Sequence, residues 1–320
     1  MCIRAFALVS MMYLTAGGVF AQGYPAKPVR LVAPYPPGGS IDIVARLVGQ
    51  KLSEALGQQF IVENRAGASG NIGTEYVAKA PADGYTLLLS GAPPLAANMY
   101  LFAKLAFDPA RDFAPIIRIA SQPNVLVLHP SVPAATVRDL VALARARPGA
   151  MNFGSGGIGA SQHISAELFM MLTGVRMAHV AYKGGGPAMI DLVGGHVDLM
   201  FETAPSALPY VESRKLKALG VTTLQRSAML PDVPTMDEAG VKGYEFVSWM
   251  GLVAPAAVPR EIVQRLNTAA QKAITGDLRK RLTELGLDVA GGTPEEFAAY
   301  IRADSAKYAK LISVAKIRPQ

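Results

Sequence analysis

The chain has 320 residues, of which 51% are hydrophobic, 17% charged and 7% aromatic. This length allows one large or two medium domains, each with a real core. Its 31 glycines and 23 prolines are scattered along the chain, which excludes a collagen-like or low-complexity protein. Thirty-one basic and 24 acidic residues give a formal charge of +7 without a block of five like charges. That balance argues against nucleic acid as a partner and favours small anions.

The first residues predict a secretory signal peptide. Arg4 is the only charge before an almost wholly apolar stretch from Ala5 to Ala21, which is shorter than the ~20 residues that span a bilayer. The stretch ends with small residues at both cleavage positions, Val19 and Ala21, so we expect cleavage after Ala21. A membrane anchor is the alternative. The only cysteine is Cys2, so the exported chain would have no disulfide, no thiol nucleophile and no Cys-ligated metal.

The chain then predicts alternating strands and helices, with a glycine-rich loop between each strand and the next helix. Ser40 is expected to cap the first helix, and Gly57 to end it. This alternation implies parallel strands. The elements expected in this first repeat are strand 28–34, helix 40–57, strand 59–63, helix 71–80 and strand 85–90.

The same order of elements recurs about 120 residues later. Pro187 is expected at the first position of its helix, where its missing N–H costs nothing. The repetition lies in the order of elements and not in sequence identity. The elements expected in this second repeat are strand 151–153, helix 161–172, strand 177–182, helix 187–193 and strand 196–202.

Two further strands, 124–129 and 245–255, lie where the chain would pass between the repeats. A helix from Pro259 follows, and a capping box at 293–296 opens a last helix. If these helices return to the first repeat, the second repeat is an insertion and the two strands form a hinge. The expected fold is therefore α/β, with two doubly wound lobes, a central cleft and a two-strand hinge. Residues 22–122 and 249–320 would form lobe 1, and residues 123–248 would form lobe 2.

Cofactor sites are not predicted. Gly154, Gly156 and Gly159 match the spacing of a dinucleotide-binding loop, but that site also needs an acidic residue about 20 positions later. No acidic residue occurs between Glu167 and Asp191. No Gly-Lys-Ser/Thr phosphate loop occurs, and the four histidines lack a metal-binding spacing. We therefore expect no nucleotide, no metal and no other cofactor.

Catalytic residues are not predicted either. Ser155 or Ser161 with His163 is the one pairing that resembles a nucleophile and a base, and the chain lacks a Gly-x-Ser-x-Gly motif. Ser161 and His163 are two positions apart on a predicted helix and so point in different directions. The plainer interpretation is a helix cap at Ser161 and a polar first-turn residue at His163. A secreted hydrolase stays the alternative function.

Four glycine-rich loops, at 38–40, 68–70, 154–159 and 184–186, precede predicted helices. Such helix starts offer unpaired N–H groups and the positive end of the helix dipole, which favour anions. Ligands of doubly wound sheets bind beyond the carboxyl ends of the strands. Two facing lobes would bring all four loops to one cleft. The alternative is that these glycines only form tight turns.

Several long segments occur in a characteristic order: PYPPGGSIDIVAR at 34–46, VENRAGASGNIG at 62–73, PADGYTLL at 81–88, AYKGGGPAMIDLVGGHVDLMF at 181–201, LPDVPTMDEAG at 230–240 and SWMGLVAP at 248–255. In these segments the chain resembles the Bug family, the extracytoplasmic solute receptors of tripartite tricarboxylate transporters, over essentially its whole mature length. The resemblance implies a periplasmic protein of the Venus-flytrap type. It implies a small carboxylate ligand (a di- or tricarboxylate, an acidic amino acid or an aromatic acid), held partly through ordered water.

The resemblance also implies the partners. The ligand would pass to the membrane subunits of a tripartite tricarboxylate transporter; a receptor that presents its ligand to the ectodomain of a sensor kinase is the alternative, and we expect a monomer. Trp249 lies in the second crossover strand, so closure of the cleft is expected to change its fluorescence unless it is buried in both states. The identity of the ligand and its affinity are not set by the sequence.

The resemblance further implies which residues contact the ligand. Lobe 1 would supply Tyr35, Pro37, Gly38, Gly39, Ser40, Asp42, Ala68 and Ser69, and lobe 2 would supply Ser155, Gly159, Ser161, His163, Tyr182, Lys183 and Gly184. Some have plainer roles as alternatives: Ser40 as a helix cap, Asp42 in a favourable first turn, and Lys183 as a solvated cation. The sequence departs from the family pattern at Glu202, where Asp is more usual, and at 91–94, where an apolar loop with Ala92 replaces a polar one. That apolar loop is expected to suit an aromatic or aliphatic ligand.

Overall fold

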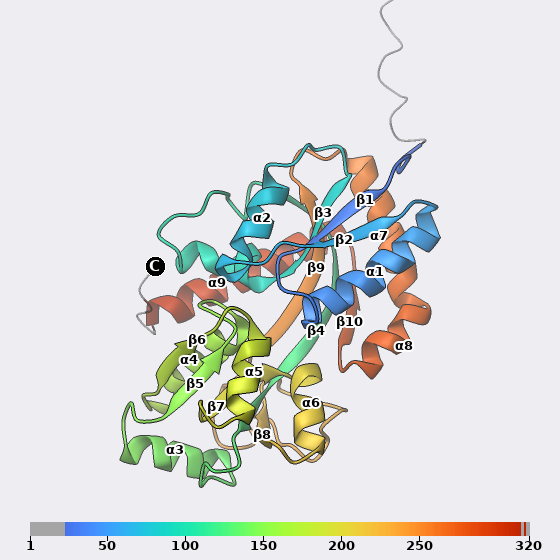
Figure 1. The fold of residues 1–320 in the computed structure, drawn as a ribbon. Helices are drawn as coiled ribbons and strands as arrows, with labels where there is room; N and C mark the ends of the chain where they lie inside the picture. Colours follow the sequence, from blue (N-terminus) through green and yellow to red (C-terminus); the bar gives the residue numbers. More distant parts are fainter. Residues whose placement is uncertain (1–22, 315–316, 318–320) are drawn as a thin grey trace, which may run out of the picture.

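The computed structural model describes residues 23–314 and 317. Figure 1 shows two α/β lobes, one above the other, joined by the long strands β4 (Phe113–Leu128) and β9 (Val247–Pro255). This arrangement is the predicted fold class. The predicted signal peptide, residues 1–21, lies outside the described residues. No helix in the described part of the chain is long and apolar enough to cross a membrane.

The first lobe is built on a sheet in the order β2-β1-β3-β9-β4, with β10 also paired to β4. β1 is parallel to β2 and β3, as the glycine-loop and helix connections predict. The helices after β9 pack back on this sheet, α7 against α1 and β4 and α9 against β4. The elements are β1 (Val29–Ala33), α1 (Ser40–Leu56), β2 (Phe60–Asn64), η1 (Ala68–Gly70), α2 (Asn71–Ala78), β3 (Thr86–Gly91), η2 (Pro93–Ala97), η3 (Asn98–Tyr100), α7 (Arg260–Thr275), α8 (Asp277–Glu284), β10 (Asp288–Gly291) and α9 (Pro294–Val314).

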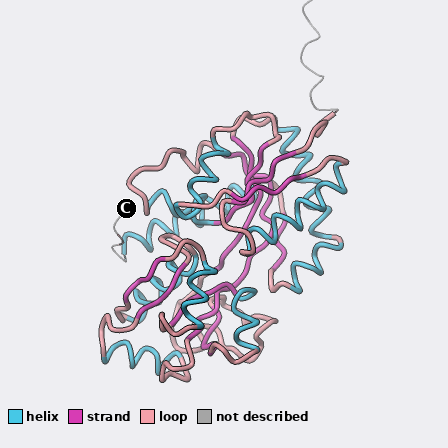
Figure 2. Tube along the Cα trace, viewed as in Figure 1, coloured by secondary structure: helices cyan, strands magenta, loops and turns pink. Residues whose placement is uncertain are grey.

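The second lobe continues the sheet in the order β4-β7-β5-β6, with β8 also paired to β4. β5 is parallel to β6 and β7, as expected for strands joined by crossover helices. Figure 2 shows the strands of both lobes running through the interior with helices on either side. The elements are α3 (Val137–Ala146), β5 (Asn152–Ser155), α4 (Ser161–Thr173), β6 (Ala178–Ala181), α5 (Gly185–Val193), β7 (Leu199–Thr203), α6 (Ala204–Glu212) and β8 (Lys217–Val221).

The two crossing strands are paired with each other along the whole of β9. The first part of β4 pairs with β9 and β10, and its last five residues, Asn124–Leu128, pair with β7. β4 therefore belongs to both lobes and is much longer than the predicted strand 124–129. The lobe limits at 123 and 248 stay a prediction.

One predicted helix detail is corrected by the structure. α5 begins at Gly185, so Pro187 is its third residue and not its first. The sequence patterns did not predict five further elements, the helices α3, α6 and α8 and the strands β8 and β10. The capping box of α9 is confirmed, since Thr293 Oγ1 accepts from the Glu296 N–H at 3.1 Å and Glu296 Oε2 accepts from the Thr293 N–H at 2.8 Å.

Candidate ligand-binding site

The loops that precede α1, α2, α4 and α5 come from both lobes and are in contact. Ser69 Oγ, in the loop before α2, donates a hydrogen bond of 2.5 Å to the carbonyl of Ile158, in the loop before α4. A Cβ added to Gly184, before α5, would lie 3.6 Å from Cγ of Pro36, before α1. In Figure 1 these loops lie where the upper and lower lobes face each other. The structure therefore has its two lobes closed on one another.

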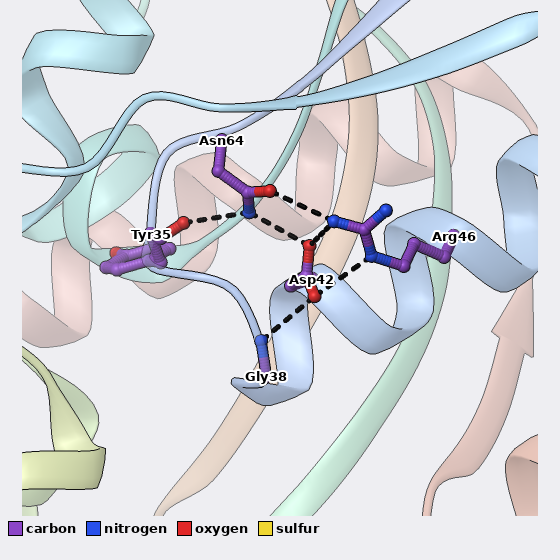
Figure 3. Close-up of polar contacts among 5 residues, drawn as sticks. All are labelled: Tyr35, Gly38, Asp42, Arg46 and Asn64. Atoms are coloured by element: carbon purple, nitrogen blue, oxygen red, sulfur yellow. Dashed lines mark hydrogen bonds and ion pairs between the residues drawn. The ribbon is translucent and has the colours of Figure 1, made fainter.

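Asp42 holds the loop before α1 in place (Figure 3). It is 3% exposed, and its carboxylate accepts hydrogen bonds from the Gly38 N–H at 2.9 Å and from Asn64 Nδ2 at 2.9 Å. Arg46 lies beside it, with Nη2 at 2.9 Å from Oδ1. Burial opposes ionisation, but the hydrogen bonds and the Arg46 charge outweigh it, so the pKa of Asp42 is lowered. Asn64, at the end of β2, also donates to the Tyr35 carbonyl at 3.0 Å, which ties this network to the loop that follows β1.

The helix cap predicted at Ser40 is wrong. Gly39 is the N-cap of α1, because the helical backbone begins at Ser40 itself. Pro37, Gly38 and Gly39 are exposed, and Ser40 is half-buried in the first turn. First-turn N–H groups have no partner within their helix, so those of Ser40 and its successor are open to an anion. The Gly38 N–H, by contrast, is already used by Asp42.

Tyr35 and Ser69 connect the first two loops of the first lobe. Tyr35 Oη donates to the Ser69 carbonyl at 3.4 Å, and a Cβ added to Gly70 would lie 3.0 Å from that Oη. Burial raises the pKa of Tyr35, which keeps its hydroxyl protonated. Ala68 and Ser69 both adopt left-handed backbone, with φ of 46° and 54°. Ala68 is exposed, whereas Ser69 is half-buried against the second lobe.

Ser155 is fully buried at the end of β5 and belongs to a network inside the second lobe. Its Oγ lies 2.6 Å from His179 Nε2 and also bonds the carbonyl and the N–H of Gly157, at 3.1 Å each. The His179 ring stacks on His163, with centroids 4.2 Å apart. Burial, and then the neighbouring His163, lower the pKa of His179 to about 3. His163 is 4% exposed, and its Nδ1 accepts the Gly159 N–H at 3.1 Å.

This network does not form the hydrolytic site considered as an alternative. Ser155 is paired with His179 and not with His163. Ser155 is out of reach of solvent, and a histidine with a pKa of about 3 is a weak base near neutral pH. Ser161 is not the N-cap of α4 either, because Ala160 holds that position.

Glu202 lies beneath the loops of the second lobe. It is 3% exposed, and its Oε1 accepts hydrogen bonds from the Thr203 N–H at 2.8 Å and from Thr203 Oγ1 at 2.9 Å. Gln162 Nε2 lies 3.3 Å from Oε2, and a Cβ added to Gly185 would also lie 3.3 Å from that atom. Burial raises the pKa of Glu202, although these hydrogen bonds oppose the shift. Glu202 therefore bonds the first turn of α4 and lies close to the first residue of α5.

The loop before α5 contains an exposed lysine and a glycine with a positive φ. Lys183 is exposed, whereas the half-buried Tyr182 donates through Oη to Asp191 Oδ2 at 2.6 Å. Burial, with the Asp191 hydrogen bond and charge, raises the pKa of Tyr182 to about 12. Gly184 has a φ of 118° and donates to the Gly156 carbonyl at 3.1 Å. The strained φ explains the glycine at this position.

The apolar loop after β3 is mostly core. Ala92 is 4% exposed and Leu95 2%, and both belong to a hydrophobic cluster; only Pro93 of this loop is half-buried. The sequence reasoning missed Asn98 just beyond it, which is fully buried and donates to the Ser69 carbonyl at 3.2 Å. It also missed Gln162 and the Ser155 partner His179. No spacing rule marks these residues, since only the folded loops bring them together.

Metal-ligating side chains do not gather here. Within residues 23–314 and 317, no three His, Cys, Asp or Glu side chains are grouped so that they could hold a metal ion.

The family model described as tripartite tricarboxylate transporter family receptor, TctC, matches residues 44–317. The chain belongs to this family. It is also called the Bug family, as the sequence motifs indicated, and its members are solute receptors. The protein is therefore a solute-binding protein and not an enzyme.

Solved structures agree with this assignment to TctC. Rpa4515 of R. palustris, whose structure contains adipate, is 40% identical over 93% of this chain and all of its own, with a TM-score of 0.90. The periplasmic binding protein BugD is 33% identical over 93% of this chain and all of its own, with a TM-score of 0.87. MatC from Rhodopseudomonas palustris, with bound malate, is 32% identical over 90% of this chain and all of its own, with a TM-score of 0.85. The TctC receptor thus has the fold of periplasmic binding proteins.

Proposed function

We propose that this receptor captures a small carboxylate between its two lobes and passes it to the membrane subunits of a tripartite tricarboxylate transporter. The observation that carries the proposal is the meeting of the starts of α1, α4 and α5 from opposite lobes. Three helix starts bring first-turn N–H groups and positive dipole ends to one region, which favours an anion. The relatives with adipate and with malate support a carboxylate as that anion.

The residues that the family resemblance implies as ligand contacts fall into two groups in this proposal. Those with groups open to a ligand are Gly39, Ser40, Ala68, Ser161 and Lys183, together with the wall at Tyr35; Pro37 has no N–H, and the Gly184 N–H already donates to the Gly156 carbonyl. Those already engaged inside the protein are Asp42, Ser155, His163 and Glu202, and they hold the loops in shape. We expect an aliphatic dicarboxylate of four to six carbons, the size range of the malate and adipate in the related structures.

A thermal-shift screen tests this function. Purified protein is heated with mono-, di- and tricarboxylates, after mass spectrometry of denatured protein has excluded a ligand carried over from the host. A ligand at 100 times its Kd adds about 2.7 kcal/mol, so the melting temperature should rise by several degrees. A shift with at least one dicarboxylate, without consumption of the compound, is expected. A ligand-free protein that no carboxylate stabilises would contradict the proposal.

We also propose that the protein is periplasmic and that its signal peptide is cleaved after Ala21. The apolar stretch that ends there supports the proposal. The intact mass of protein recovered from the periplasm is expected to correspond to a chain that begins at Gln22. An unprocessed chain that fractionates with membranes would instead support an anchor.

A further inference from the structure

Ser69 makes a direct hydrogen bond between the two lobes. Its Oγ donates to the carbonyl of Ile158 at 2.5 Å, across 89 residues of sequence. The hydroxyl is therefore engaged by the opposite lobe. This use differs from the ligand contact that the family resemblance implied for the residue.

We infer that Ser69 is a closure residue, whose hydroxyl locks the two lobes together and sets how fast a bound ligand leaves. The inference rests on the proposed function. Because the bond joins loops of different lobes, it forms only when those loops meet. It thus stabilises the closed state selectively, which shifts the population toward closure. Ser69 acts on the ligand indirectly, as a positioning residue.

The backbone around Ser69 is built to aim this hydroxyl. Ala68 and Ser69 both have positive φ, a conformation that costs free energy for non-glycine residues and is kept where surrounding contacts impose it. Those contacts are present: the Ser69 carbonyl accepts from Asn98 Nδ2 at 3.2 Å and from Tyr35 Oη at 3.4 Å. With its carbonyl held inside the first lobe, the side chain is directed to the second.

The loop before α4 leaves room for the Ser69 hydroxyl to approach the Ile158 carbonyl. Ile158 lies between Gly157 and Gly159, which have φ of 124° and 78°. A Cβ added to Gly157 would lie 3.2 Å from Ser69 Oγ, and one added to Gly159 would lie 2.7 Å from Oδ1 of Asn98. Side chains at either position would crowd the first lobe, so the glycines allow the close approach that the bond requires.

The kinetic test compares Ser69→Ala with Ser213→Ala. The hydroxyl of Ser213 bonds only within its own helix end, to Pro209 and Tyr210. Release rates are measured by stopped flow for several dicarboxylates found by the screen. Loss of one interlobe hydrogen bond should speed release about 5-fold in Ser69→Ala, by the same factor for every ligand and without a change in association rate. Ser213→Ala should match the parent.

Two results would overturn the inference: an unchanged release rate, or a factor that differs between ligands, which would mark Ser69 as a ligand contact. Ser69→Gly is the second variant, because glycine accepts the left-handed backbone without strain and also lacks the hydroxyl. It should release ligand as fast as Ser69→Ala or faster. If the alanine variant does not fold, the glycine variant decides the question.

A second measurement needs no ligand. In a Cys2→Ser background, spin labels are placed at Ala55→Cys in α1 and Ile190→Cys in α5, both exposed and in different lobes. Electron paramagnetic resonance then gives the distance distribution between the lobes. The fraction at the short, closed distance should fall in Ser69→Ala. Identical distributions would overturn the inference even if no carboxylate bound and the proposed function had failed.

Discussion

The side chains under the ligand loops are mostly occupied by one another. Asp42 shows this most clearly, because a carboxylate in the first turn of α1 competes for the donors that an anionic ligand would use. It takes the Gly38 N–H and the Asn64 amide and is neutralised by Arg46. The sequence motif places Asp42 correctly in the first turn of the helix that follows the glycine loop. It does not reveal that the carboxylate is turned inward, because that depends on Asn64, which lies at the end of β2.

Asp42→Asn tests this role. With its pKa lowered in the folded state, Asp42 contributes stability above its ordinary pKa near 4, and that stability is lost as the pH falls through the folded-state value. The variant should lose about 2 kcal/mol of unfolding free energy at pH 7, from hydrogen bonds made by a charged group. The difference from the parent should shrink toward pH 3. Urea unfolding at both pH values measures it.

The control is Asp232→Asn, since Asp232 is exposed. This variant should unfold like the parent at both pH values. A loss of stability in Asp42→Asn that is equal at pH 7 and pH 3 would show that packing, and not the charge of Asp42, stabilises the loop.

At the scale of elements, local patterns predict the strands and helices next to glycine loops best. Gly57 ends α1 in the left-handed conformation, as expected, with φ of 72°. The length of β4 was underestimated. Pro115 and Pro123 lie within it, and proline is normally found only in edge strands, at the first residue of a strand or at bulges. At Pro115 the strand changes its register with β9, between Pro115 and Ile117. A second register shift lies between Arg118 and Ala120. Such irregular pairing depends on the partner strand, which a local pattern does not contain.

At the scale of the whole molecule, the repeated order of elements and the family motifs predict two lobes joined by two crossing strands, and this arrangement is confirmed; that the two strands act as a hinge stays a prediction. One hydrophobic cluster includes Val32 and Leu88 of the first lobe, Trp249 of β9, and Phe153 and Phe201 of the second lobe. Trp249 is 2% exposed, and its Nε1 donates to Asp304 of α9 at 2.6 Å. Its use as a reporter of closure stays a prediction. The contact of the lobes through Ser69 was not predictable, because it depends on the approach of two loops 89 residues apart.

The central claim is that a carboxylate is held between both lobes, and small-angle X-ray scattering with and without a ligand from the screen tests it most directly. With a saturating dicarboxylate, the scattering curve should match the closed structure described here. Without ligand, the radius of gyration should be larger, because closure then lacks the contacts that the ligand adds. Identical curves at saturation and in the absence of ligand, with binding confirmed by calorimetry, would mean that the carboxylate does not close the lobes and would contradict the account.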